Sequence, residues 1–216
     1  MAIKGAIFDM DGTLLDSMYV WLGIGCRYLE YKGITPDDED RELLEVALLA
    51  PQAEHFIKKY GFTMAVNEIV DDINKFIEHE YMNNVQMKPG IPELLKDLKS
   101  RGVKMCIASL SDRYLIEGAF KRLGFLDYFE DLLSCTVLGC DKTTPFIFEE
   151  GIRILGTSKD STYVFEDSLL AIKTAKRAGF KTVGIRDSWA ESVQDKIKEI
   201  ADFYITTPNE LDIDKL

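Results

Sequence analysis

Acidic residues occur in pairs at two places, each directly after a short apolar run, and both pairs could bind a cation. Asp9 and Asp11 form the first pair, and Glu166 and Asp167 form the second. On an extended chain, residues i and i+2 point the same way, so Asp9 and Asp11 can face one site. Carboxylates that converge raise one another's pKa unless a cation neutralises them. Hard oxygen ligands of this kind predict Mg²⁺ that retains several waters.

Two further side chains could hold an anion at the same place. Ser109 follows the apolar run 103–108, where its hydroxyl and nearby backbone N–H groups can donate to a phosphate oxygen. Lys142 lies beyond the run 132–139 and precedes a helix that is expected to begin at Pro145. A loop serine or a loop lysine alone is usually solvated or capping. Ser109 and Lys142 are stronger candidates for anion binding because both are expected at the same end of the sheet.

Strand-like and helical patterns alternate along most of the chain. The expected strands are short apolar runs over residues 6–8, 103–108, 132–135, 163–165, 182–185 and 203–205. Helical periodicity covers residues 91–98, 115–123, 146–155 and 169–178. This alternation predicts an α/β fold with a doubly wound parallel sheet, a Rossmann-like core. In such sheets ligands bind at the carboxyl ends of the strands, where the acids, Ser109 and Lys142 are expected.

One stretch lacks strand-like runs and shows only helical periodicity. It extends over about residues 17–86, with one helix expected over 66–77 and another over 21–29, ending at Gly33. We expect residues 1–16 and 87–216 to form the α/β catalytic core. Residues 17–86 are then an inserted α-helical cap subdomain.

Composition limits the classes of partner. The chain has 216 residues, with 26 Lys and Arg against 37 Asp and Glu, and a net charge of −11. Nucleic acid is disfavoured because phosphate backbones are held by surplus basic residues. No apolar run approaches the ~18 residues that would span a bilayer. With no secretory signal pattern at the start, we expect a cytoplasmic protein with no membrane partner.

The order of these residues resembles the haloacid dehalogenase-like superfamily. The similarity lies in Phe8-Asp9-Met10-Asp11-Gly12-Thr13-Leu14-Leu15-Asp16-Ser17, in Val164-Phe165-Glu166-Asp167-Ser168 and in Pro89-Gly90-Ile91. It covers nearly the whole chain. The branch concerned has an α-helical cap inserted after the first motif and contains phosphatases and β-phosphoglucomutases.

The resemblance implies a phosphoryl-transfer role for each core residue. Asp9 would be the nucleophile and form an aspartyl-phosphate. Asp11 would be the general acid toward the leaving alkoxide and then the general base for water. Ser109, Leu110 and Lys142 would bind the phosphoryl group. The substrate would be a small phosphorylated metabolite, and the cap would exclude water and choose it.

The resemblance also implies Mg²⁺ as the cofactor. Its ligands would be Asp9, Asp167 and the backbone carbonyl of Asp11, with Glu166 supporting them directly or through water. Two departures from the family pattern concern packing. The usual Lys-Pro-x-Pro-Asp is Lys142-Thr143-Thr144-Pro145-Phe146, and Ala171 stands where glycine is common.

The leading interpretation is a phosphomonoesterase, and the alternative is a β-phosphoglucomutase-like mutase. The two share every core residue and would differ in the cap, where a mutase needs cations for a second phosphate. Arg41, Lys58 and Lys59 are candidates for that role. A receiver-type signalling domain also gathers acids, a hydroxyl and a lysine around Mg²⁺, but it is much shorter and has no inserted cap.

Overall fold

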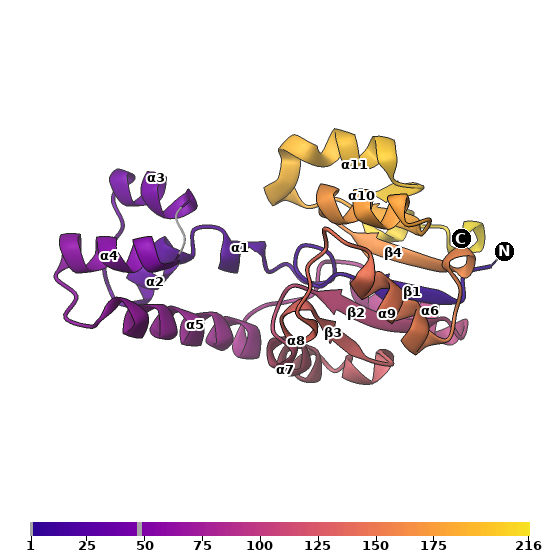
Figure 1. Ribbon diagram of the computed structural model, residues 1–216, viewed down its shortest axis with the longest axis horizontal. Coiled ribbons are helices and arrows are strands. Elements are labelled where there is room, and N and C mark those ends of the chain that lie inside the picture. Colours follow the sequence, from indigo (N-terminus) through magenta and orange to yellow (C-terminus); the bar gives the residue numbers. More distant parts are fainter. Residues whose placement is uncertain (1, 47–48) are drawn as a thin grey trace. The chain divides into compact units, whose positions relative to one another are not determined.

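The computed structural model describes residues 2–46 and 49–216, which fold into two compact units (Figure 1). The first unit comprises Met1–Asp16 and Gln86–Leu216, and the second comprises Ser17–Val85. Among the described residues, no helix has both the length and the hydrophobicity needed to cross a bilayer.

A parallel sheet lies at the centre of the first unit. Its strands are β1 (Gly5–Phe8), β2 (Lys104–Ser109), β3 (Leu132–Ser134), β4 (Thr162–Glu166), β5 (Lys181–Ile185) and β6 (Phe203–Ile205). They lie in the order β3-β2-β1-β4-β5-β6, and every pairing is parallel. The α/β prediction is therefore confirmed. Strand β1 lies between β2 and β4, so the strands that carry the two acid pairs are neighbours.

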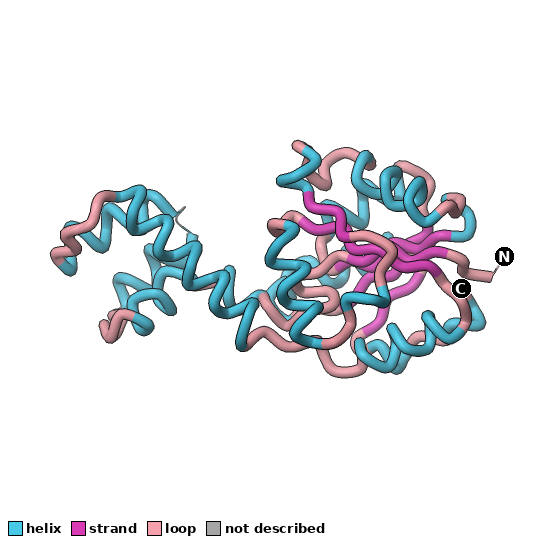
Figure 2. The backbone as a smooth tube through the Cα atoms, turned by 90° about the horizontal axis from the view of Figure 1, so that it is seen from below, coloured by secondary structure: helices cyan, strands magenta, loops and turns pink. Residues whose placement is uncertain are grey.

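Helices cover both faces of this sheet (Figure 2). They are α6 (Ile91–Ser100), α7 (Arg113–Leu123), α8 (Cys135–Leu138), α9 (Phe146–Leu155), α10 (Leu169–Arg177) and α11 (Gln194–Ile200). Short 3₁₀ segments lie at Leu126–Tyr128, Lys159–Ser161, Ser188–Val193, Pro208–Glu210 and Ile213–Lys215.

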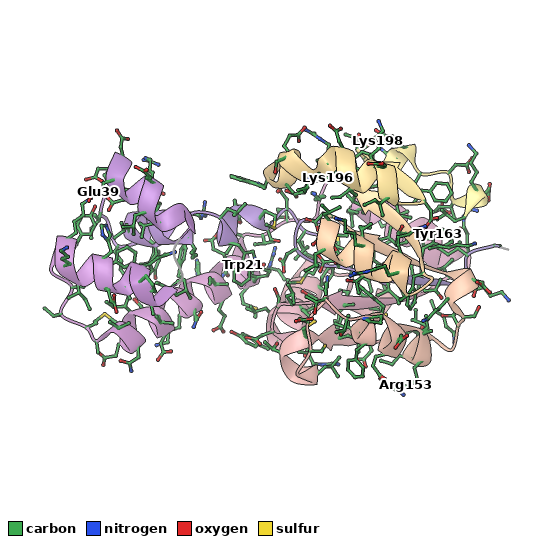
Figure 3. All side chains as sticks on the ribbon, turned by 45° about the horizontal axis from the view of Figure 1, so that its top comes forward. Trp21, Glu39, Arg153, Tyr163, Lys196 and Lys198 are labelled. Atoms are coloured by element: carbon green, nitrogen blue, oxygen red, sulfur yellow. The ribbon has the colours of Figure 1, made fainter. Side chains whose placement is uncertain are left out.

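Alternate residues of the strands pack against different helices. Ile7 of β1 and Val164 of β4 share a buried cluster with apolar residues of α9 and α10. On the opposite face Phe8 stacks on Phe165, with ring centroids 4.4 Å apart. Charged side chains such as Arg153 of α9 and Lys198 of α11 are exposed on the outer faces of the helices (Figure 3). Burial on both faces explains why the strands read as continuous apolar runs.

Within its described residues, the second unit is built from helices. They are α1 (Met18–Trp21), α2 (Ile24–Tyr31), α3 (Asp38–Val46), α4 (Leu49–Tyr60) and α5 (Val66–Asn83). The ring of Tyr28 packs against those of Phe56, Phe62 and Phe76, at centroid distances of 5.8–6.4 Å. The buried rings of Tyr28 and Phe56 therefore lie in the core of this unit, whereas Trp21 and Tyr31 are exposed.

Several expected element boundaries differ from the structure, and two of the differences change the elements themselves. The single helix expected over 21–29 is two helices, because the chain turns at Gly23, which has a φ of 73°. A positive φ of this size interrupts a helix and is adopted readily by glycine. The strand expected over 132–135 ends at Ser134, and Cys135 begins α8.

Candidate active site

The parallel register brings Asp9 of the first acid pair and both acids of the second together at the carboxyl end of the sheet. Phe8 is paired with Phe165, and the N–H of Asp9 donates to the carbonyl of Phe165 at 3.0 Å. Carboxylate oxygens of Asp9, Glu166 and Asp167 lie within 4.8 Å of one another, and all three residues are buried. Acids separated by more than 150 positions in the sequence thus form one cluster.

Lys142 supplies a positive charge to this cluster. Its Nζ lies 2.5 Å from Asp9 Oδ1 and 2.5 Å from Glu166 Oε1, and the side chain is only 5% exposed. Burial alone would lower the pKa of Lys142, but the charges of Asp9 and Glu166 outweigh burial and raise it. Lys142 is therefore a fixed cation. The second oxygen of Glu166 accepts the N–H of Ser168 at 2.9 Å, so both of its oxygens have donors.

The remaining charge of the cluster suits a divalent cation. Burial, and then repulsion from Glu166, raise the pKa of Asp9 from 3.8 to about 6. Burial, with repulsion from Glu166 and Asp9, raises the pKa of Asp167 well above its ordinary value. A single lysine does not balance three buried carboxylates, and a divalent ion would neutralise them. The donor set is oxygen only, which fits Mg²⁺.

The side chain of Asp11 is bound to the loop after β2. Its Oδ2 accepts a hydrogen bond from the hydroxyl of Ser111 at 2.6 Å, and the N–H of Ser111 donates to Ser109 Oγ at 3.0 Å. The carbonyl of Ser111 accepts the Ser134 hydroxyl at 2.8 Å. Ser109, which is 1% exposed, thus lies in a hydrogen-bonded chain that ends at Asp11. Leu110 is 60% exposed, and because its side chain is apolar its backbone N–H is the one polar donor it could offer to an anion.

The loop after β1 is fitted closely around Asp167. Gly12 has a φ of 77°, and a Cβ on it would lie 2.5 Å from Asp167 Oδ2. The hydroxyl of Thr13 donates to Asp167 Oδ1 at 2.8 Å. We did not predict this role for Thr13, although its place next to Gly12 in the first motif was the available signal. The absence of a Cβ at position 12 allows the loop after β1 to lie close to Asp167.

The loop that carries Lys142 lacks the first proline of the family pattern, but side-chain hydrogen bonds hold it. Asp141 Oδ1 accepts the N–H of Thr143 at 2.8 Å and also its hydroxyl. The Thr174 hydroxyl of α10 donates to the Thr143 carbonyl at 3.4 Å. This Asx-type turn is a local restraint of the kind that proline otherwise provides.

Comparisons with known proteins agree with this geometry. A family model described as haloacid dehalogenase-like hydrolase matches residues 6–185. The "Probable pseudouridine-5'-phosphatase" of Drosophila melanogaster is 29% identical over 115 residues, 53% of this chain and 49% of that protein. The chain therefore spans about half the length of that relative. The N-acetylmuramic acid 6-phosphate phosphatase of Pseudomonas aeruginosa is 25% identical over 234 residues, covering 98% of this chain and 94% of that protein.

A solved structure shares the fold. The β-phosphoglucomutase of Clostridium difficile has a TM-score of 0.68 at 22% identity, covering 99% of this chain and 95% of that chain. At that identity the likeness shows the fold alone. The family model, in contrast, matches most of the chain, including both acid pairs and Lys142. The chain belongs to the haloacid dehalogenase-like hydrolase family.

Proposed function

We propose that this protein is a Mg²⁺-dependent phosphomonoesterase that acts on a small phosphorylated metabolite through an aspartyl-phosphate. The observation that carries the proposal is the contact of Lys142 with both Asp9 and Glu166, at 2.5 Å each, beside Asp167. A nucleophilic carboxylate, a fixed cation and an oxygen donor set are what in-line phosphoryl transfer to an aspartate needs.

Each step of the proposed reaction is assigned to a residue. A carboxylate oxygen of Asp9 attacks phosphorus while the bond from phosphorus to the leaving oxygen breaks. Asp11 donates a proton to that oxygen, and the alcohol leaves. Water then attacks the aspartyl-phosphate, Asp11 takes its proton, and inorganic phosphate and free Asp9 result. Lys142 and the groups of Ser109 and Leu110 bind the phosphoryl oxygens.

The oxygen cluster is where Mg²⁺ would be held. Asp9 and Asp167 would supply carboxylate oxygens, the backbone of Asp11 a carbonyl oxygen, and Glu166 would act directly or through water. When bound, the ion neutralises charge on the transferring phosphoryl group. Glu166 orients Lys142, and Ser111 orients Asp11 through the 2.6 Å hydrogen bond.

The charges of the helical unit favour a phosphatase over a mutase. Residues 17–85 contain 13 Asp and Glu against 6 Lys and Arg. Lys59, a candidate for a second phosphate site, donates to Asp37 at 2.7 Å and to Asp40 at 3.0 Å. A mutase must hold a second phosphate with cations, whereas a phosphatase has no such requirement. The mutase nevertheless stays the second candidate, because β-phosphoglucomutase shares the fold.

The first test is hydrolysis of p-nitrophenyl phosphate by the purified protein. Wild type should release phosphate with Mg²⁺, lose activity with a chelator and regain it when Mg²⁺ is added back. Asp9→Asn should lower kcat by at least about 1,000-fold, because an amide cannot form the acyl-phosphate. An unchanged circular dichroism spectrum would show that the variant is folded. Activity near the wild-type level in Asp9→Asn would refute the nucleophile assignment.

A panel of phosphorylated metabolites then separates the two candidates. A phosphatase should release free phosphate from members of the panel. A mutase should instead interconvert glucose phosphates and release little phosphate.

A further inference from the structure

A partly buried lysine outside the cluster contacts the loop that carries the catalytic acids. The side chain of Lys88 is 15% exposed, and its Nζ donates to the carbonyl of Gly12. The same Nζ lies 2.7 Å from Asp187 Oδ2 and 2.9 Å from the carbonyl of Arg186. One ammonium group thus joins the loop after β1 to the end of β5.

Asp187 is itself fixed by other contacts. Its side chain is 2% exposed, and its Oδ1 accepts the N–H of Trp189 at 2.8 Å. Its carbonyl accepts Gln194 Nε2 at 3.2 Å, from the first turn of α11. The carboxylate therefore has a defined position without Lys88. The fixed Asp187 carboxylate holds the ammonium of Lys88, so this ammonium limits where the Gly12 carbonyl can lie.

The orientation of the Gly12 carbonyl affects the neighbouring Asp11, because hydrogen bonds fix the peptide groups on both sides of Gly12. The N–H of Gly12 donates to the Leu15 carbonyl at 3.0 Å, which sets the peptide between Asp11 and Gly12. Lys88 sets the next peptide through its bond to the Gly12 carbonyl. Together they restrict the direction of the Asp11 carbonyl, which belongs to the first of these peptides.

Lys88 lies on the segment that returns from the helical unit to the sheet. Its N–H donates to the Leu14 carbonyl at 3.0 Å, and Met87 forms a bridge with Leu15. The returning segment therefore runs beside the loop after β1 and contacts it through backbone and side chain. The ammonium adds a charged donor to these backbone contacts.

We propose that Lys88, anchored by Asp187, is a positioning residue for phosphoryl transfer, which holds the loop of Asp9 and Asp11 in its reactive conformation. It does not touch the reacting atoms and acts through the Gly12 carbonyl. The proposal rests on the phosphatase function proposed above. A displacement of a catalytic group by about 1 Å can lower the reaction rate by about 100-fold. Loss of the contact between Lys88 and the Gly12 carbonyl should therefore lower kcat.

The test compares Lys88→Met with Lys159→Met as a matched control. Like Lys88, Lys159 donates to a carboxylate and to the backbone, Glu149 at 2.9 Å and the Ala178 carbonyl at 3.0 Å, but it precedes the amino end of β4. We expect Lys88→Met to lower kcat on p-nitrophenyl phosphate by about 30-fold or more, with KM changed less than about 3-fold. Lys159→Met should keep wild-type kcat, and Lys88→Arg should recover part of it.

A purely structural role of the ion pair predicts a different result. Lys88→Met leaves Asp187 buried and unpaired, which lowers Tm whatever the loop does. Adding Asp187→Asn removes that charge and should raise Tm again. If Lys88 is a positioning residue, the double variant regains Tm while kcat stays low. If kcat returns with Tm, or if Lys88→Met never loses kcat, the proposal is wrong.

A second readout separates this proposal from the phosphatase function. Amide hydrogen exchange at residues 10–15 should become faster in Lys88→Met and not in Lys159→Met, whether or not a substrate is turned over. A wild-type protein without activity toward any phosphomonoester would refute the proposed function. Unchanged exchange in Lys88→Met would refute the positioning role even if the enzyme is active.

Discussion

Gly12 shows how a single side chain, or its absence, determines the geometry of the site. Its Cα faces Asp167, its N–H and carbonyl fix the loop after β1, and its φ is 77°. A larger residue would strain the backbone and push Asp167 away from Asp9. The requirement is therefore both conformational and steric.

Gly12→Ala separates these two requirements when it is compared with Gly102→Ala. Gly102 also has a positive φ, 73°, but a methyl group on its Cα would meet no described atom within 4 Å. Both variants should lose about 1 kcal/mol of stability from left-handed strain. Gly12→Ala should lose more, because its methyl group would also meet Asp167 at 2.5 Å. Only Gly12→Ala should lower kcat, by about 100-fold or more, and raise the Mg²⁺ concentration for half-maximal activity. Equal activity of the two variants would contradict the steric argument.

At the scale of elements, α3 of the helical unit begins with a reciprocal pair of caps. The N–H of Asp40 donates to Asp37 Oδ1 at 3.0 Å, and the N–H of Asp37 donates to Asp40 Oδ2 at 2.9 Å. Asp40 also accepts from His55 at 2.7 Å, from Lys59 at 3.0 Å and from the hydroxyl of Tyr60. This carboxylate therefore links the start of α3 to the last turns of α4.

Asp40→Asn should destabilise the protein in a pH-dependent way. Burial would raise the pKa of Asp40, but its hydrogen bonds, led by that of Tyr60, lower it below 3.8. A carboxyl with a lowered folded-state pKa contributes stability above its ordinary pKa, and the contribution is lost as the pH falls through the folded value. Asp40→Asn should lower the midpoint temperature, Tm, of the first unfolding transition of the full chain by about 5 °C at pH 7. The difference from wild type should shrink below about pH 4.

Glu39→Gln is the matched control for this variant. Glu39 also contacts Lys59, at 3.1 Å, but its side chain is 72% exposed, and exposed ion pairs contribute little. Its Tm should stay within about 1 °C of wild type. A similar loss in both variants would show that Lys59 pairing, and not the buried carboxylate, stabilises the unit.

At the scale of the whole molecule, the net charge of −11 opposes the binding of an anionic substrate. Lys142 offers little long-range attraction, because it is already paired with two carboxylates. The long-range field is therefore negative and is screened by salt over about 10 Å at 0.1 M.

Raising NaCl from about 10 to about 150 mM at fixed Mg²⁺ should increase kcat/KM for p-nitrophenyl phosphate by about 2-fold. The change should lie in KM, because kcat refers to substrate that is already bound. Steady-state kinetics across the salt series would measure it. A kcat/KM that falls with salt would mean that the local positive field of the site dominates approach.

The sequence by itself determined the architecture of the α/β unit, and it predicted the acids and the lysine that the structure brings to one edge of the sheet. Continuous apolar runs such as residues 163–165 identify strands buried on both faces, and acids directly after them identify the ligand-binding edge. These signals are local. The break at Gly23 was missed because a helical pattern continues across it, and a single glycine does not always end a helix.

Only the tertiary structure decided which distant groups meet. Sheet order places β4 beside β1, and this puts Glu166 and Asp167 against Asp9 with Lys142 between them. The contact of Lys88 with Gly12 crosses 76 positions and leaves no periodic trace in the sequence. Spacing along a chain encodes local direction, whereas contacts between loops depend on strand order and register. Those follow from the packing of the whole unit.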